Sequence, residues 1–448
     1  MMNSFLRSIS QVRCISTVRI NQLLARNDAI DNIQIQGWIT KLHKTGNWFF
    51  AQINDGSCTK SVQVVLRKNI GRNLGVGSAV QIAGNWVLSQ GSQQSMELLA
   101  TSCFLSALNE SLPISGDSDV IRDQIHLRAK HPSFASILRL RSSLHRLSHQ
   151  FFMDEQFYHI DTPLISINDC EGAGEAFVIK NPKDEDYFGV DNVFLPVSGQ
   201  LHLEAVAGGL LNVYTISPAF RAEKSLSRQH MAEFRMLEAE CAFMDSLNDL
   251  CSLIEKYIKF IVQNMEPLKE DIENLNAFYD DSSNRERASF NLIKMVSENQ
   301  EFPRIEYSEA VKLLEKLCLP VKGGLNKEQE LLLVKEFNSP VFITYFPSSQ
   351  KPFYMKRDES ERFAECFDLL APYVGELAGG SVRENEVEKL RKRSDLPALE
   401  WYYELRTRGY PISSGFGLGI DRFMQSLLGI LNIKDTIPFP RWYKHVQC

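Results

Sequence analysis

Apolar and polar residues alternate in short runs along the first hundred residues. The period of two in each run is typical of a half-buried strand. The runs with the clearest alternation are 33–39, 48–53, 62–66, 79–88 and 96–105. Turn-forming segments, such as the NDGS that follows Ile53, separate them. Five strands in fewer than a hundred residues predict a small closed β-barrel, a form that commonly binds single-stranded nucleic acid.

The periodicity changes after a Pro- and Gly-containing break at 113–117. From Phe134 onward, apolar residues recur at helical spacing, and 157–163 (FYHIDTP) then returns to an extended path. Further strands are expected around Val178, Phe194 and Val213, and over 234–244 and 364–370. A polar, Lys- and Glu-rich stretch at about 266–337 is predicted to be an insertion. The pattern predicts an α+β domain built on a mainly antiparallel sheet with flanking helices.

The N-terminal residues have a composition of their own. Arg7, Arg13, Arg19 and Arg26 are interleaved with serines, and no acidic residue precedes Asp28. An acid-free, Arg- and Ser-containing amphipathic opening is typical of a mitochondrial presequence, and the alternative is a frayed terminus. The predicted organisation is a presequence at 1–19, a barrel at 20–108, a hinge at 109–130 and the larger domain at 131–448.

Composition limits the class of protein but does not indicate a function. The chain of 448 residues is 44% hydrophobic and 23% charged, as in ordinary globular proteins, which excludes a disordered or fibrous protein. Its formal net charge of −6 argues against a uniformly basic nucleic-acid coat, although a local basic groove stays compatible with it. Charged residues interrupt every apolar stretch, so we expect no membrane association.

The stretch FRAEKSLSRQHMAEF (220–234) gathers residue types that suit ATP. Arg221 and Glu223 alternate along a strand-like run, a polar loop follows, and His230 and Phe234 resume an extended segment. One face of such a hairpin holds cations for the phosphates and an aromatic platform for adenine. The alternatives are a surface ion pair for Arg221 and Glu223, and a core position for Phe234.

A second stretch, GFGLGIDR (415–422), has glycines at alternate positions. Glycine lets the backbone approach a ligand closely, and Arg422 stands at the start of the apolar helix that follows. A tight strand-to-helix turn explains the pattern about as well. No GxxxxGK[ST] sequence occurs, so a P-loop is not the phosphate-binding device.

Three segments in this order resemble the signature motifs of class II aminoacyl-tRNA synthetases of the aspartate-like subgroup. The helix ending in Pro163 resembles motif 1, FRAE with the loop to Phe234 resembles motif 2, and GFGLGIDR resembles motif 3. The resemblance implies an OB-type anticodon-binding barrel followed by a class II catalytic domain. Four further segments resemble asparaginyl-tRNA synthetases in particular: CEGAGEAF (170–177), VSGQLHLE (197–204), GELAGGSVRE (375–384) and IPFPR (437–441).

The resemblance implies a role for individual residues at the ATP site. Arg221 and Arg422 are the implied catalytic residues. Arg221 would hold the α-phosphate, His230 and Arg422 would neutralise the β- and γ-phosphates, and Phe234 would stack on adenine. The implied ATP-binding set is Arg221, Glu223, His230, Phe234, Glu376, Gly419 and Arg422. The implied Mg²⁺ ligands are Asp368 and Glu376, which agrees with the preference of this ion for carboxylates.

Selecting asparagine over aspartate depends on one terminal group, NH₂ against O⁻. In related aspartate enzymes a Lys occupies the place of Leu203, and its absence here favours asparagine. By resemblance Arg383 grips the side-chain oxygen, and Glu223 is an acceptor suited to the amide. The other implied residues of this pocket are Glu171, Gln200 and Glu204.

The resemblance also implies partners and a location. The substrates would be ATP, asparagine and tRNA(Asn), with Mg²⁺, in an asparagine–tRNA ligase of the mitochondrial matrix. The motif 1 helix implies a homodimer. In the barrel, Phe50 and Gln63 are the implied readers of an anticodon base, while core packing competes for two of the neighbours Trp48, Phe49 and Phe50 because strand neighbours point to opposite faces.

Two departures from the family pattern leave alternatives open. Gln229 stands where related chains usually have an Arg, and Ser413 and Ser414 stand where a His is common. The nearest rival function is an aspartyl or dual-specificity aspartyl/asparaginyl-tRNA ligase. Two further rivals are an amide-forming synthetase on the same catalytic fold and a non-catalytic RNA-binding paralogue.

Overall fold

The computed structural model describes residues 16–71, 73–91, 94–110, 114–167, 176–181, 183, 187–190, 193–279, 291–394 and 396–448. The chain divides into two compact units, Met1–Ser136 and Ile137–Cys448. Most of the expected presequence, including Arg7 and Arg13, lies outside the described residues, as does Glu171 of the expected amino-acid pocket.

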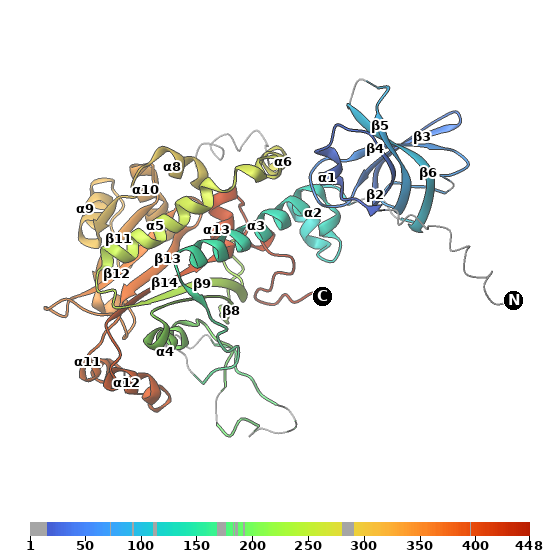
Figure 1. Ribbon diagram of the computed structural model, residues 1–448. Helices are drawn as coiled ribbons and strands as arrows, with labels where there is room; N and C mark the ends of the chain where they lie inside the picture. The colour runs from blue at the N-terminus through green and yellow to red at the C-terminus, as the bar shows by residue number, and fades with distance from the viewer. Residues whose placement is uncertain are drawn as a thin grey trace. The chain divides into compact units, whose positions relative to one another are not determined.

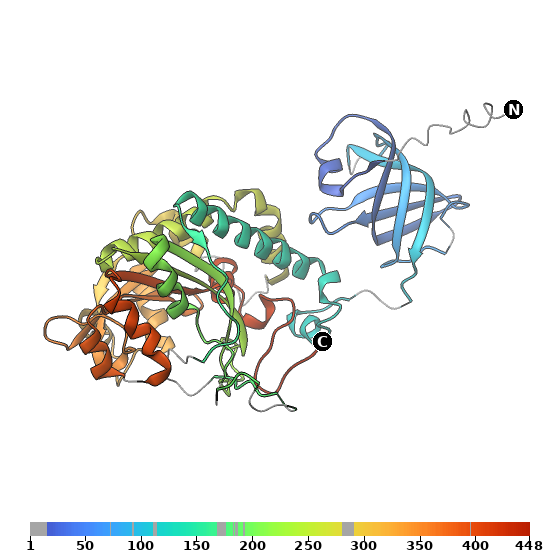
Figure 2. The ribbon, with the colours of Figure 1, turned by 60° about the horizontal axis from the view of Figure 1, so that its bottom comes forward.

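The first unit contains a closed barrel (Figures 1 and 2). Its elements are β1 (Ser16–Thr17), α1 (Ile20–Leu24), β2 (Ile30–Thr45), β3 (Trp48–Asn54), β4 (Val62–Arg67), β5 (Ala79–Leu88) and β6 (Met96–Ala107). Antiparallel pairing of β2 with β5 and parallel pairing of β4 with β6 close the sheet on itself. Alternate residues such as Ile35, Ile53, Val64 and Ile82 fill the interior with no exposed surface. The predicted barrel is confirmed.

After the barrel, the stretch expected to be a hinge contains regular structure. Helix α2 (Ser118–Asp123) and the 3₁₀ turn η1 (Arg128–Lys130) form there. Asp117 caps α2, because its side chain accepts hydrogen bonds from the backbone of Asp119 and Val120.

The second unit is built on an eight-stranded sheet in the order β10-β11-β12-β13-β14-β9-β8-β7. The strands are β7 (Tyr158–His159), β8 (Asn212–Phe220), β9 (Glu233–Ala242), β10 (Arg304–Glu306), β11 (Val341–Pro347), β12 (Phe363–Ala371), β13 (Gly375–Val382) and β14 (Ser413–Gly419). All pairings from β11 to β8 are antiparallel, and only the two edge pairings are parallel. The expected α+β class with a mainly antiparallel sheet is confirmed.

Helices cover both faces of this sheet (Figure 1). They are α3 (Pro132–Asp154), α4 (Gln200–Leu210), α5 (Leu247–Gln263), α6 (Lys269–Tyr279), α8 (Leu292–Glu298), α9 (Tyr307–Lys316), α10 (Lys327–Phe337), α11 (Val387–Arg393), α12 (Glu400–Thr407) and α13 (Ile420–Leu428). Helix α3 packs on α5, where Phe151 meets Tyr257 and Ser148 Oγ lies 2.7 Å from Tyr257 Oη. Helix α4 lies against β8 and β9 and also contacts α12.

One expectation for the second unit was wrong in detail. Val178 and Phe194 form an isolated bridge and not regular strands. In the stretch interpreted as an insertion, Leu314, Leu333 and Val334 are buried in the core beside β11.

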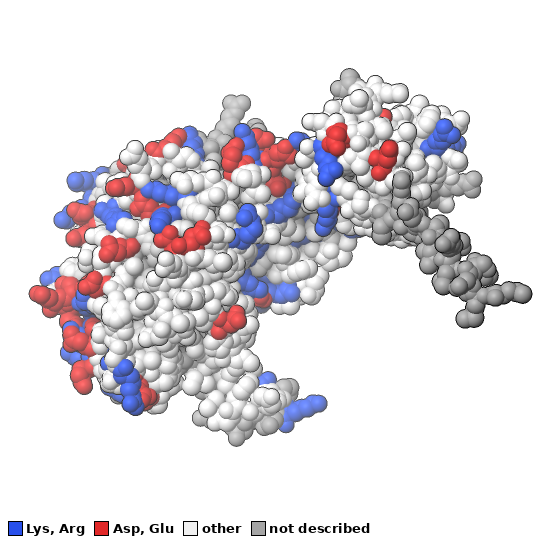
Figure 3. All heavy atoms as spheres, in the orientation of Figure 1, with Lys and Arg blue, Asp and Glu red and all other residues white. Residues whose placement is uncertain are grey.

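Charges on the surface are mixed. On the face that Figure 3 shows, Lys and Arg side chains are interspersed with Asp and Glu over the larger unit. No helix in the described part of the chain combines the length and apolar character needed to span a membrane.

Candidate active site

The loop between β8 and β9 is shaped by its own side chains. The strand-like run expected through Glu223 ends earlier, at Phe220, and His230 lies in the loop and not in a strand. The hydroxyls of Ser225 and Ser227 lie 3.3 and 2.5 Å from His230 Nδ1, so local hydrogen bonds compete with a continued strand.

The same loop is held from outside by the C-terminal segment. The backbone N–H of Ile433 donates to the carbonyl of Arg228 at 2.9 Å, and the N–H of Ala232 donates to the carbonyl of Arg441 at 2.7 Å. Arg441 belongs to the IPFPR sequence. The loop is therefore tied at both ends of its second half.

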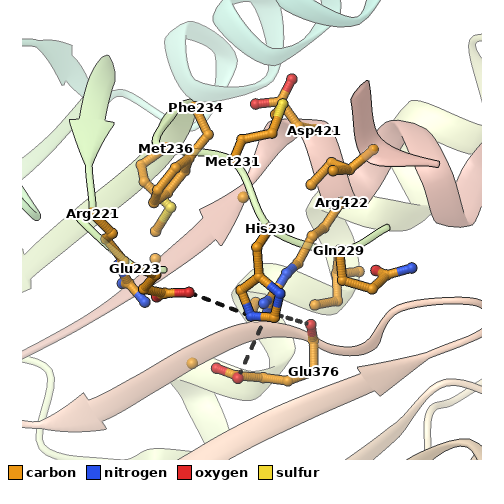
Figure 4. A pocket seen from close by; sticks show the side chains of 16 residues that line it. Arg221, Glu223, Gln229, His230, Met231, Phe234, Met236, Glu376, Asp421 and Arg422 are labelled. Carbon is orange, nitrogen blue, oxygen red and sulfur yellow. Dashed lines mark hydrogen bonds and ion pairs between the residues drawn. The ribbon is translucent and has the colours of Figure 1, made fainter. Parts of the chain in front are cut away.

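A pocket forms where this loop meets β13, β14 and α13 (Figure 4). Six of the residues expected at the ATP site line it: Arg221, Glu223, His230, Phe234, Glu376 and Arg422. Gly419, the seventh, lines it as well. All seven residues come from three segments that are far apart in the sequence, so the fold brings the implied ATP-binding set together.

Charged side chains and an aromatic ring lie close together in this pocket. Arg221 Cζ lies 5.6 Å from the centre of the Phe234 ring. His230 Nε2 lies 3.4 Å from Glu223 Oε2, and their side chains are 40% and 26% exposed. Arg422 Nη1 donates to the Glu376 carbonyl at 3.1 Å and lies 3.8 Å from its carboxylate. Cations grouped in this way suit a polyanionic ligand.

Strand register places the two expected metal ligands close together. Asp368 on β12 is paired with Gly379 on β13, and a Cβ added at Gly379 would lie 3.6 Å from both Asp368 Oδ1 and Glu376 Oε1. The two carboxylates thus border one hollow. Lys351 Nζ donates to both oxygens of Asp368 at 2.7 Å. Burial raises the pKa of Asp368 to about 6.

Helix α10, from the stretch interpreted as an insertion, reaches this end of the pocket. Glu330 Oε2 accepts a hydrogen bond from the backbone N–H of Glu376 at 3.0 Å. It occupies the place of a side chain at Gly375, whose φ is +71° and whose added Cβ would lie 2.2 Å from that oxygen. No local pattern signalled this contact, because Glu330 meets Glu376 only through the tertiary fold, 46 residues away in the chain.

One row of paired residues runs across β12, β13, β14 and β9. Asp368 pairs with Gly379, Gly379 with Gly417, and Gly417 with Glu238. The two glycines in the middle line the pocket. A Cβ added at Gly417 would lie 2.9 Å from Met236 Cε, so this glycine of the GFGLG sequence makes room for that side chain.

The amino-acid end lies two residues further along the same strands, about 7 Å away. Here Arg383 is 3% exposed, and its Nε and Nη2 bond the two oxygens of Glu240 while Nη1 donates to Ser381 Oγ at 2.7 Å. Burial opposes the charge, but Glu240 and Glu204 outweigh it and raise the pKa of Arg383. A Cβ on Gly415 would lie 2.1 Å from Glu240 Oε1, so this glycine makes room for Glu240.

Other residues expected at this end are present but not exposed. Gln200 Nε2 donates to Glu204 Oε1 at 3.0 Å, and Glu204 is fully buried. Glu223 lines the pocket described above, 3.4 Å from His230, whereas Arg383 is not among the residues that line that pocket.

Glu238 was missed by the sequence reasoning. It is 4% exposed, its Oε2 accepts from Gly199 N–H at 2.8 Å, and its Oε1 accepts from Ser198 Oγ. Burial raises its pKa, while the hydrogen bonds from Ser198 and Gly199 and the charges of Arg221 and Arg383 oppose this rise. The available signal was the MLEAECA run (236–242), where two acids on one face of an apolar strand require partners.

The two departures from the family pattern have different surroundings. Ser413 Oγ accepts from Tyr410 Oη at 3.2 Å, and Ser414 Oγ donates to the Met244 carbonyl at 2.7 Å, so both have structural roles. Gln229 lines the pocket, and its Oε1 is buried with no hydrogen-bond partner among the described residues.

In the barrel, strand alternation separates the three adjacent aromatics. Phe49 points inward and is 6% exposed, while Trp48 is 38% exposed on the outer face. Phe50 shares that outer face with Gln52, which is directly opposite Gln63 on β4. Phe50 and Gln63 therefore lie on one surface of the barrel, and Gln63 Nε2 donates to Glu97 at 2.9 Å.

Comparison with known proteins agrees with this geometry. Residues 117–443 match the family described as tRNA synthetases class II (D, K and N), and residues 33–105 match the OB-fold nucleic acid binding domain. The chain therefore belongs to the class II tRNA synthetases and has aminoacyl-tRNA ligase activity.

Within that family the chain groups with the asparagine–tRNA ligases. It is 38% identical to an asparaginyl-tRNA synthetase of Mus musculus, covering 97% of this chain and 95% of the relative. It is 35% identical to a probable mitochondrial asparagine–tRNA ligase of Dictyostelium discoideum, covering 95% and 96%. The asparaginyl-tRNA synthetase of Pyrococcus horikoshii in complex with asparaginyl-adenylate is 28% identical, with a TM-score of 0.85 over 97% of this chain and all of that one.

Proposed function

We propose that the chain activates asparagine with ATP to asparaginyl-adenylate and transfers the asparaginyl group to the 3′ end of tRNA(Asn). The observation that carries the proposal is the meeting of Arg221, His230, Phe234 and Arg422 in one pocket next to the buried Arg383. Cations and an aromatic ring suit ATP, and a buried arginine suits a small polar side chain.

At the ATP end, the residues act by binding and positioning. Arg221 holds the α-phosphate, Phe234 stacks on adenine, and His230 and Arg422 hold the β- and γ-phosphates. The reaction needs no protein nucleophile, since aligning the carboxylate with the α-phosphate and stabilising charge on its oxygens supply the catalysis.

Asp368 and Glu376 are the residues that would hold Mg²⁺. The described residues contain no group of three or more His, Cys, Asp or Glu side chains able to hold a metal ion. Two carboxylates around the Gly379 hollow nevertheless fit Mg²⁺, which usually binds one or two carboxylates together with substrate phosphates. When bound, Mg²⁺ would neutralise charge on the departing pyrophosphate.

At the amino-acid end, Arg383 donates to the side-chain carbonyl oxygen. We assign the amide NH₂ to Glu238 instead of Glu223, because Glu238 is two residues from Glu240, the partner of Arg383, on β9, and Glu223 pairs with His230. A carboxylate at this position accepts from NH₂ and repels the O⁻ of aspartate. Gln200 and Glu204 form the wall of this pocket.

A homodimer is supported by an exposed apolar surface. Tyr158 on the edge strand β7 is 59% exposed, and Met153, Leu211 and Phe243 nearby are 65%, 55% and 71% exposed. Apolar side chains at a sheet edge favour association with a second copy. Light scattering should give about twice the monomer mass, and a Phe243→Glu variant should give the monomer mass.

The location and the RNA contacts are proposed on other grounds. The acid-free opening and the mitochondrial Dictyostelium relative support a mitochondrial matrix location. Phe50 and Gln63 are proposed to contact an anticodon base on the outer face of the barrel.

Amino-acid-dependent exchange between pyrophosphate and ATP tests the proposed function. We expect exchange with asparagine and none with aspartate. Exchange with aspartate alone would establish the rival ligase, and exchange without any binding of tRNA would establish the amide-forming rival.

A further inference from the structure

A group of four ionised side chains is buried beside the amino-acid end of the site. Glu204 is fully buried, Glu240 is 1% exposed, Arg383 is 3% exposed, and the Arg406 side chain is fully buried. Buried charges are rare unless each has a partner. Two acids and two arginines balance within this group.

Arg383 has only part of its hydrogen-bonding capacity committed within the described residues. A guanidinium has five N–H groups. Glu240 takes two of them and Ser381 takes one. Two remain for the substrate, provided that no second carboxylate takes them.

Glu204 is the second carboxylate that attracts the Arg383 guanidinium. Its Oε1 lies 3.9 Å from Arg383 Nε, whose single N–H is donated to Glu240, so this contact is an attraction and not a hydrogen bond. That oxygen accepts from Gln200 Nε2 at 3.0 Å, and Oε2 accepts from Arg406 Nη2 at 2.5 Å and Tyr402 Oη at 2.8 Å. Arg406 is thus the cation that binds Glu204 directly.

Helix α12 presents both partners from one face. Tyr402 and Arg406 are four residues apart, so they are neighbours on the helix surface. Arg406 Cζ lies 4.0 Å from the centre of the Tyr402 ring and 5.0 Å from that of Tyr410, and its Nε donates to the Glu384 carbonyl at 3.3 Å. The guanidinium is fixed in place on several sides.

We infer that Arg406 is a positioning residue for amino-acid selection: by neutralising Glu204 it keeps Arg383 paired with Glu240, so that the two remaining N–H groups of Arg383 stay available to the substrate side chain. The inference rests on the proposed role of Arg383. It adds to the site a residue that touches no substrate, from a helix to which the family motifs assign no role.

The test is the ratio of two Michaelis constants in pyrophosphate exchange, one for the amino acid and one for ATP. In Arg406→Met, Glu204 keeps its hydrogen bonds from Gln200 and Tyr402 but loses its bonded cation, so its charge draws Arg383 away from Glu240. We expect the amino-acid KM to rise about 30-fold, the lower end of the effect of unpairing a buried charge, while the ATP KM changes little.

A double variant distinguishes positioning from a loss of folding. Glu204→Gln with Arg406→Met removes both charges, so Arg383 is no longer attracted, and most of the lost amino-acid affinity should return. Arg408→Met is the matched control, because Arg408 ends the same helix with a 77% exposed side chain paired to Glu404. It should leave both constants unchanged.

Unchanged amino-acid KM in Arg406→Met would overturn the inference, as would equal changes in both constants, which indicate a purely structural role. If Arg406→Met does not fold, an amino-acid KM in the double variant as high as that of Arg383→Met would overturn it. The readout is separate from the proposed function: exchange with aspartate would refute asparagine as substrate, yet the two constants would still report on Arg406.

Discussion

The two ends of the site hold charge in opposite ways. At the phosphate end, His230, Glu223 and Arg422 are partly exposed and their nearest oppositely charged atoms are 3.4 to 3.8 Å away. At the amino-acid end, Arg383 and Glu240 are almost fully buried and bonded through two pairs of atoms. The phosphate end presents charged side chains to a charged ligand. At the amino-acid end, the buried charges neutralise each other before any ligand binds.

This difference follows from the ligands expected at each end. A triphosphate carries several charges, and its β- and γ-phosphates must leave as pyrophosphate. The side chains that bind them therefore have to release them. An amide carries no charge and differs from a carboxylate by one group, so its site needs a fixed arrangement of donors and acceptors. Substitutions at the buried end should therefore affect stability and activity together, and those at the exposed end activity alone.

The largest effect is expected from Arg383→Met. The change removes the proposed side-chain grip and leaves Glu240 buried without a counter-charge, which costs about 3–5 kcal/mol of unfolding free energy. We expect asparagine-dependent exchange to fall by about three orders of magnitude or more. Exchange assays and urea unfolding measure the two effects, and an unaltered unfolding midpoint would contradict the assignment of this end as a closed charge pair.

Arg422→Ala should lower activity with little change in stability. Loss of one cation at the phosphates should reduce kcat/KM in exchange about 10²- to 10³-fold. Because the side chain is partly exposed, the unfolding free energy should change by about 0.5 kcal/mol or less. Undiminished adenylation would show that the phosphate site lies elsewhere.

Two glycines on β14 allow the two ends of the site to be compared within one strand. An added Cβ at Gly415 would lie 2.1 to 2.4 Å from the Glu240 carboxylate, while at Gly419 the nearest atom is 3.9 Å away. Gly415→Ala should destabilise by about 1–3 kcal/mol through overpacking. Gly419→Ala should leave the thermal midpoint nearly unchanged, and equal midpoints for the two variants would refute the difference between the ends.

The smallest effect is expected from His145 on α3, whose neighbour Asp421 lines the pocket at the phosphate end. Burial and, to a smaller extent, the charge of Arg141 lower the pKa of His145 to about 4, while Asp421 opposes this. The unfolded chain therefore takes up a proton below about pH 6.5 that the folded protein rejects, so stability falls as pH decreases toward 4.

Between pH 7.5 and 5 the wild type should lose about 1–2 kcal/mol that His145→Gln does not lose, with a discount for the incomplete burial of the ring. Unfolding curves of both proteins at the two pH values measure the difference. Parallel losses in the two proteins would mean that His145 does not contribute.

Local pattern was enough for much of the fold but not for the buried end of the site. The barrel strands were predicted because each alternates between a closed interior and solvent. The ATP-site residues were implied because they lie within short motifs around Arg221 and Arg422. Both kinds of signal are contained in neighbouring residues.

Tyr402, Arg406 and Glu330 were missed because their roles depend on contacts between segments far apart in the sequence. Tyr402 and Arg406 on α12 are buried against Glu204, which lies 198 and 202 residues away. Glu330 reaches the backbone of Glu376 from 46 residues away. His230 was expected in an extended segment, but hydrogen bonds with neighbouring serines hold it in a loop.

The pairing of Glu204 with Arg406 also restricts how this chain can diverge. The two residues are 202 positions apart, so one mutational event does not change both. Either change alone leaves a buried charge without its partner. Descendant sequences should therefore keep both or replace both, and a library randomised at the two positions together should recover active combinations that successive single-site libraries miss.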